Sequence, residues 1–258
     1  MIVDVQESIE RLKHTGRYTY ILDHIKTSEL TNWPYVFEML FADEFVLHGL
    51  YLDYEANINP SNDKTIDFIY HAEGKTKFLF ELVRPEMSTI LQSEYDQKMY
   101  RDDVDGVMVS SDNANEKLRP EAQKIRLQEK LLEKVEKFPE PDDKNFSVIV
   151  VDCSNLHFGH FDDDDARISM YGLPKNPILL ERWNGKRILG MLEKNYTKRN
   201  ALDFQDKITA VVFVPMLQAK KMLNGAKIIF NYLRTEQHRI LFQSMSNDLY
   251  PISHIKWL

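Results

Sequence analysis

The sequence predicts an α/β protein in which helices flank a mixed β-sheet. Helical patterns alternate with short strand-like patterns along the chain. Two nearly continuous apolar runs, 147–153 and 208–214, are typical of strands that are buried on both faces at the centre of a helix-covered sheet. Hydrophobic residues make up 43% of the 258 residues, which is enough for one sizeable core.

Two helices are expected at the beginning of the chain. Apolar residues recur at helical spacing over 6–26, around Gly16. The second predicted helix covers 33–47, because Asn32 can cap it and Pro34 lies in its first turn.

Three strands are then expected, over 50–55, 65–71 and 77–83. The last two are joined by the short loop Glu73-Gly74-Lys75. A connection of this length between two strand patterns favours an antiparallel hairpin.

The remaining elements alternate in type. A helix is expected over 87–100, a short strand over 106–110 and a long charged helix over 119–138. The Pro-rich segment 139–144 is the best internal break, and 216–233 has the pattern of another amphipathic helix.

Composition limits the classes of function. The formal net charge is −7, from 33 basic and 40 acidic residues, which argues against a protein that coats nucleic acid, although a local basic groove remains compatible with it. The single cysteine, Cys153, excludes an internal disulfide framework and Cys-rich metal motifs. No run reaches ~18 apolar residues and no signal-like segment opens the chain, so we expect a cytoplasmic protein without a membrane partner.

Two carboxylates of the predicted hairpin occupy positions that suit metal chemistry. Asp67 lies near the start of one hairpin strand and Glu81 near the end of the next. Asp67 and Glu81 can therefore lie beside each other across the hairpin. Mg²⁺ prefers hard oxygen ligands and usually takes one or two carboxylates, and it can then activate water and hold phosphoryl oxygens. The expected cofactor is Mg²⁺ or Mn²⁺, held by Asp67 and Glu81.

These residues carry a family resemblance. Segment 33–110, with its helix glutamate, the strand sequence Ile66-Asp67 and the strand Leu79-Phe-Glu-Leu-Val83, resembles the core of the PD-(D/E)XK nuclease superfamily. The resemblance implies a restriction-endonuclease-like fold, catalytic Glu38, Asp67 and Glu81, and a lysine two residues after the strand glutamate.

This chain departs from the pattern at that lysine. Val83 occupies the lysine position, and Arg84 points to the opposite face of the strand. We expect another lysine to take the role, and Lys98 in LQSEYDQKMY is the first candidate, since Gln97 and Tyr100 around it resemble a Gln-x-x-Tyr element of some exonuclease-like members. Lys124 and Lys130 on the later helix are alternatives.

Three functional hypotheses follow. The first is a metal-dependent nuclease that cleaves DNA or RNA. The second is a catalytically degenerate member that binds nucleic acid or protein, which Val83 and the acidic net charge favour. The third is an unrelated interaction protein. In domain terms we expect a single α/β domain over 1–258, with a possible subdivision into a nuclease-like core, 1–138, and a C-terminal extension, 145–258, that contributes strands.

Overall fold

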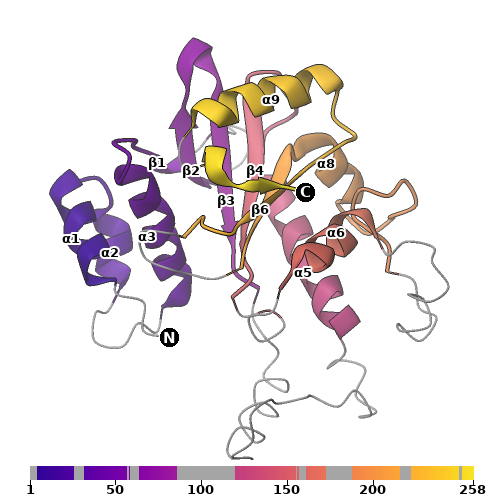
Figure 1. The fold of residues 1–258 in the computed structure, drawn as a ribbon, viewed down its shortest axis with the longest axis horizontal. Helices are drawn as coiled ribbons and strands as arrows, with labels where there is room; N and C mark the ends of the chain where they lie inside the picture. Colours follow the sequence, from indigo (N-terminus) through magenta and orange to yellow (C-terminus); the bar gives the residue numbers. More distant parts are fainter. Residues whose placement is uncertain are drawn as a thin grey trace, which may run out of the picture.

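The protein forms a mixed β-sheet with helices on both faces, which confirms the predicted α/β class (Figure 1). The computed structural model describes residues 5–25, 32–56, 58, 64–85, 120–154, 156, 161–172, 188–215, 222–249 and 252–258. Within these residues, no helix is both long and apolar enough to span a membrane.

The sheet has seven strands that lie side by side in the order of the chain. They are β1 (Asp53–Ala56), β2 (Ile66–His71), β3 (Lys77–Val83), β4 (Asn145–Asp152), β5 (Ala210–Val214), β6 (Lys227–Phe230) and β7 (Lys256–Trp257). The first three form an antiparallel meander, β3, β4 and β5 are parallel, β6 is antiparallel to β5, and β7 is parallel to β6. Strands from both halves of the chain therefore belong to one sheet.

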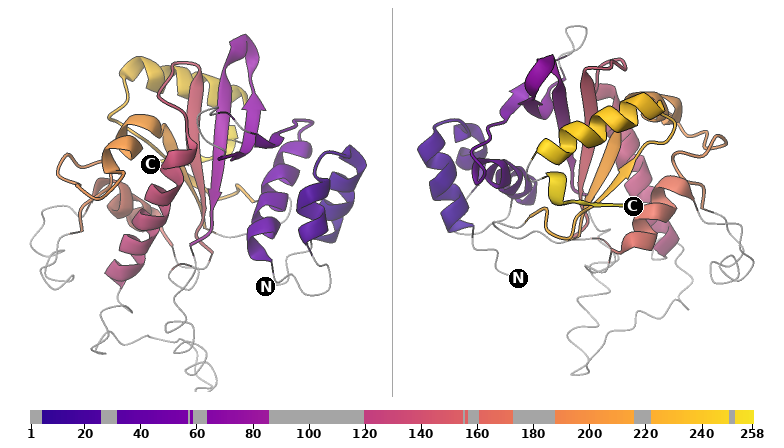
Figure 2. Two further views of the ribbon diagram at one scale, coloured as in Figure 1. Left: turned by 180° about the vertical axis from the view of Figure 1, so that it is seen from behind. Right: turned by 45° about the horizontal axis from the view of Figure 1, so that its top comes forward.

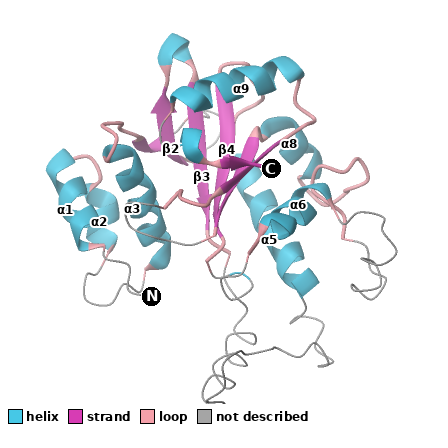
Figure 3. Ribbon diagram, in the orientation of Figure 1, coloured by secondary structure: helices cyan, strands magenta, loops and turns pink. Residues whose placement is uncertain are grey.

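Helices cover the sheet from two sides (Figures 2 and 3). They are α1 (Gln6–Thr15), α2 (Thr19–His24), α3 (Trp33–Val46), α5 (Pro120–Lys134), α6 (Asp163–Tyr171), α8 (Ala201–Lys207) and α9 (Glu236–Asp248), with the short 3₁₀ turns η1 (Glu73–Lys75), η3 (Val135–Lys137) and η5 (Ile252–His254). One core cluster joins the sheet to α1, α2, α3 and α9, and a second joins its other face to α5, α6 and α8.

Strand β3 shows how the two cores are separated. Phe78 and Phe80 belong to the core under α3 and α9, whereas Leu79 and Val83 belong to the core under α5. Successive side chains of a strand point to opposite faces. Glu81, between Leu79 and Val83, therefore faces α5.

Helix α3 is buried on nearly all sides, because it lies between the sheet and the pair α1–α2. Its Phe41 ring contacts Phe68 of β2 at 5.5 Å and Phe80 of β3 at 5.2 Å between centroids. Buried Asp43, on the same helix, is paired with Arg11 of α1 at 2.6 Å. These contacts fix the helix that carries Glu38.

Two expectations about the elements need correction. The helical pattern over 6–26 forms two helices, since Gly16 adopts a left-handed φ of 66° that ends α1. The predicted helix over 216–233 is wrong, because 227–230 forms strand β6 against β5. Short apolar runs fit a helix or a strand equally well in sequence, and pairing with β5 decides for the strand. The predicted elements 87–100 and 106–110 lie outside the described residues.

Candidate active site

Asp67 and Glu81 lie next to each other on β2 and β3. The antiparallel register pairs Phe68 with Phe80, so continuing it by one residue places Asp67 opposite Glu81. The Asp67 Oδ2 atom accepts a hydrogen bond of 2.7 Å from the backbone N–H of Leu82, which fixes the Asp67 carboxylate against β3. The hairpin thus brings together the two carboxylates that were expected to share a metal.

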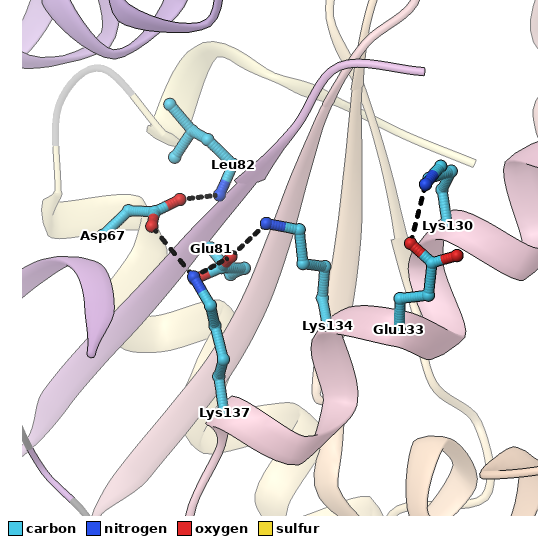
Figure 4. Close-up of polar contacts among 7 residues, drawn as sticks. All are labelled: Asp67, Glu81, Leu82, Lys130, Glu133, Lys134 and Lys137. Atoms are coloured by element: carbon cyan, nitrogen blue, oxygen red, sulfur yellow. Dashed lines mark hydrogen bonds and ion pairs between the residues drawn. The ribbon is translucent and has the colours of Figure 1, made fainter. Parts of the chain in front are cut away.

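Two lysines converge on Glu81 from the covering helix (Figure 4). Lys134, the last residue of α5, and Lys137, the last residue of η3, each donate to Glu81 Oε1 at 2.6 Å. The Glu81 side chain is 0% exposed. A buried carboxylate is costly unless it is paired, and the two ammonium groups offset that cost.

Lys137 also joins the two carboxylates, because its Nζ lies 3.3 Å from Asp67 Oδ1. Burial acts to lower the pKa of Lys137, but the charges of Asp67 and Glu81 outweigh it and raise that pKa. Burial and the neighbouring Asp67 charge raise the pKa of Glu81 to about 7, even with both lysines in contact. A carboxyl group with a pKa near neutrality is typical of functional sites.

Glu38 borders the same group from α3. Its Oε2 accepts a hydrogen bond of 2.7 Å from the hydroxyl of Tyr54 on β1. Burial, together with the charges of Asp67 and Glu81, raises the pKa of Glu38 to about 7, although the Tyr54 hydroxyl opposes the shift. The three carboxylates are therefore electrostatically coupled.

The raised pKa of Glu38 predicts a dependence of stability on pH. The folded protein holds a proton on Glu38 up to about pH 7, whereas the unfolded chain releases it near pH 4.5, the ordinary pKa of a glutamate. Stability from this group is therefore fully present below pH 4.5 and is lost as the pH rises through about 7. We expect Glu38→Gln to gain stability relative to wild type as the pH rises from 5 to 8, measured by urea unfolding.

The control for this experiment is Glu133→Gln, which removes a carboxyl that is 58% exposed on α5. Its unfolding free energy should follow the wild-type pH profile. A Glu38→Gln protein that also follows the wild-type profile would contradict the assignment of the raised pKa to Glu38.

Of the lysines that the sequence offered in place of Val83, Lys124 and Lys130 lie in the described residues. Val83, at the family's lysine position, is buried in the core under α5. Lys98 lies outside the described residues. Lys124 is paired with Asp165. Lys130 is paired with Glu133 at 2.8 Å and lies away from Asp67 and Glu81 (Figure 4). Neither Lys124 nor Lys130 therefore forms an ion pair with Asp67 or Glu81.

Sequence reasoning missed Lys134 and Lys137. Both fall within the charged helix expected over 119–138, and residues three apart on a helix lie on one face. That spacing is a usable signal, but acidic residues are interleaved with the lysines throughout the segment. Only contact with β3 distinguishes these two lysines from the others.

Arg84 is turned away from this group. Its guanidinium is paired with Asp152 at the end of β4, and it lies over the ring of Trp33 on α3 at 4.9 Å from the centroid. This agrees with the expectation that Arg84 points to the opposite face of β3 from Glu81.

The residue types fit a hard divalent cation. Asp67 and Glu81 supply carboxylate oxygens, and Glu81 Oε2 is buried without a hydrogen-bond partner in the described structure. Among the described residues, no three His, Cys, Asp or Glu side chains gather into a metal site. Mg²⁺ commonly takes only one or two protein carboxylates and keeps several waters, so the pair is sufficient for it.

No family model matches the chain, and no curated protein or solved structure matches it. Function is therefore inferred from the geometry and charge of the site.

Proposed function

We propose that this protein is a metal-dependent nuclease with a restriction-endonuclease-like core, in which lysines of the covering helix replace the missing strand lysine. The observation that carries the proposal is the convergence of Lys134 and Lys137 on Glu81, each at 2.6 Å, beside Asp67. A site of this family needs carboxylates together with a positively charged side chain. Because Val83 occupies the family's lysine position, another residue must supply that charge.

The two carboxylates and the two lysines of the site have distinct roles in this proposal. Asp67 and Glu81 would hold Mg²⁺ or Mn²⁺, with the Asp67 carboxylate oriented by the Leu82 N–H. The bound ion would supply an activated water and charge neutralisation at the phosphate. Lys134 and Lys137 place two ammonium groups where negative charge develops during phosphoryl transfer, and such preorganised charges are effective in a partly buried site.

Glu38 adds a proton-carrying group at the edge of the site. Its pKa of about 7 allows it to be protonated or ionised near neutral pH, which suits proton transfer to or from a reacting oxygen. The hydroxyl of Tyr54, at 2.7 Å, fixes its orientation.

One observation favours the degenerate alternative. Lys137 bonds both carboxylates, at 2.6 Å to Glu81 and 3.3 Å to Asp67, so an internal ammonium group occupies the position between them. A protein in which this lysine permanently replaces the metal would keep the fold and bind nucleic acid or protein without cutting.

The experiment that separates the two functions is a cleavage assay on a mixed panel of DNA and RNA. We expect the wild-type protein to cut with Mg²⁺ or Mn²⁺ and to stop cutting when EDTA removes the metal. Asp67→Asn should abolish cutting, because it removes the charge of a metal ligand but keeps an oxygen that can accept from the Leu82 N–H. Calorimetric titration with Mn²⁺ should show binding to wild type and none to Asp67→Asn.

The matched control is Asp53→Asn on the neighbouring strand β1. Asp53 is 48% exposed and paired with Arg17 and His71 rather than with the site. This variant should cut and bind Mn²⁺ like wild type. A wild-type protein that neither cuts with any divalent metal nor binds Mn²⁺, yet binds nucleic acid, would instead support the degenerate alternative.

A further inference from the structure

Four aromatic side chains form a contiguous surface group beside the site, which we call the ring cluster: Tyr20, His24, Tyr35 and Tyr54. The ring of Tyr20 lies 4.3 Å from His24, 6.2 Å from Tyr35 and 6.0 Å from Tyr54 between centroids. His24 and Tyr35 are stacked at 4.6 Å. The cluster therefore joins α2, α3 and β1.

The rings are held in place by hydrogen bonds while part of their surface faces solvent. His24 Nδ1 lies 2.8 Å from the backbone oxygen of Tyr20. The Tyr54 hydroxyl donates a hydrogen bond to Glu38, and the Tyr35 ring is stacked on the His24 ring. Tyr20 is nevertheless 46% exposed. Aromatic groups that are already ordered lose little entropy when a ligand binds.

The ring cluster is continuous with the candidate active site. Tyr54 donates a hydrogen bond to Glu38 at 2.7 Å, and the charge of Asp67 acts on both Tyr54 and Glu38. A chain that lay across the rings would thus pass the edge of the carboxylate group.

We propose that the ring cluster stacks the bases of a single-stranded nucleic acid whose backbone is presented to Asp67 and Glu81. This inference rests on the proposed nuclease function and specifies its substrate class. Aromatic side chains stack on unpaired bases of any sequence, because every base has a π face. A duplex offers few free base faces, since its bases are already stacked and paired, so single strands are favoured.

The charges around the ring cluster predict how single-strand binding depends on salt. Both Glu38 and exposed Glu55 act on Tyr35 electrostatically, so the rings lie in an acidic surrounding. Phosphate contacts there are unfavourable, and affinity comes from stacking. Since the salt dependence of binding reports the number of neutralised phosphates, single-strand binding should depend only weakly on salt.

The test measures binding without cutting. Fluorescence anisotropy with a labelled oligothymidylate and with a duplex of equal length is recorded in EDTA. We expect wild type to prefer the single strand, and Tyr20→Ala and Tyr35→Ala each to weaken single-strand binding by roughly 5- to 150-fold. Tyr20→Phe and Tyr35→Phe keep the ring and should bind like wild type. None of these substitutions changes a charge, so the comparison isolates stacking.

Tyr232→Ala is the matched control, because Tyr232 is 55% exposed but contacts Tyr171 outside the ring cluster. It should bind like wild type, and thermal unfolding should show that the alanine variants remain folded. Folded Tyr20→Ala and Tyr35→Ala proteins with wild-type affinity, equal affinity for the duplex, or no nucleic-acid binding at all would overturn the inference.

The two proposals fail separately. If the protein binds single strands through the rings yet never cuts, the inference stands and the nuclease function falls. If it cuts and the ring variants bind normally, the nuclease function stands and the ring cluster has no part in substrate binding.

Discussion

The variants Lys134→Met and Lys137→Met are each expected to cut about 10²–10³-fold more slowly than wild type. This is the usual effect of removing one preorganised hydrogen-bond donor from a site where negative charge develops. Both ammonium groups lie 2.6 Å from Glu81 Oε1, and methionine keeps an unbranched side chain but loses the charge. Single-turnover rates with saturating Mg²⁺ measure the effect on chemistry. Losing both lysines should leave no measurable activity.

The control is Lys130→Met on the same helix. Lys130 is 50% exposed and paired with Glu133 at 2.8 Å, so its loss should leave the rate unchanged. Thermal unfolding of each variant separates a catalytic effect from a loss of folded protein, since Glu81 is left buried with one partner fewer.

Lys98→Met belongs in the same series, because Lys98 was the first candidate from sequence. Wild-type rates for Lys134→Met and Lys137→Met, together with a slow Lys98→Met protein, would return the role to Lys98. Wild-type rates for all three would show that this site works without a lysine.

The largest expected effect on stability concerns Arg84. Its guanidinium is paired with Asp152, which is 0% exposed at the end of β4, while the Arg84 side chain is 10% exposed and lies over Trp33. Removing one partner of a buried pair leaves an uncompensated charge. We expect Arg84→Met to lower the free energy of unfolding by about 3–5 kcal/mol, measured by urea denaturation at neutral pH.

Two further proteins test the cause of that loss. The double variant Arg84→Met, Asp152→Asn removes the buried charge as well and should recover much of the stability. Lys198→Met breaks a surface ion pair between Lys198, which is 39% exposed, and Glu129, which is 52% exposed. This change should lower the free energy of unfolding by only about 0–1 kcal/mol. An Arg84→Met protein as stable as Lys198→Met would show that the buried pair contributes little.

The sequence by itself determined the local features of this protein. Alternation of apolar residues predicted strands at the positions of β2 and β3, and the short Gly74 loop predicted their hairpin. The same alternation put Glu81 and Val83 on one face and Arg84 on the other. These features depend on neighbouring residues, and the hydrophobic period and turn chemistry record them directly.

Only the tertiary structure decided which cation meets the carboxylates. Lys134 and Lys137 are separated from Glu81 by 53 and 56 residues, and nothing in the local pattern distinguishes them from other lysines of a mixed-charge helix. They reach Glu81 because β3 and β4 are parallel, and α5, in the connection between them, covers the Glu81 face of the sheet. Pairing with β5 likewise made 227–230 a strand. Such proximity depends on how the sheet is assembled from distant segments, which no short window of sequence contains.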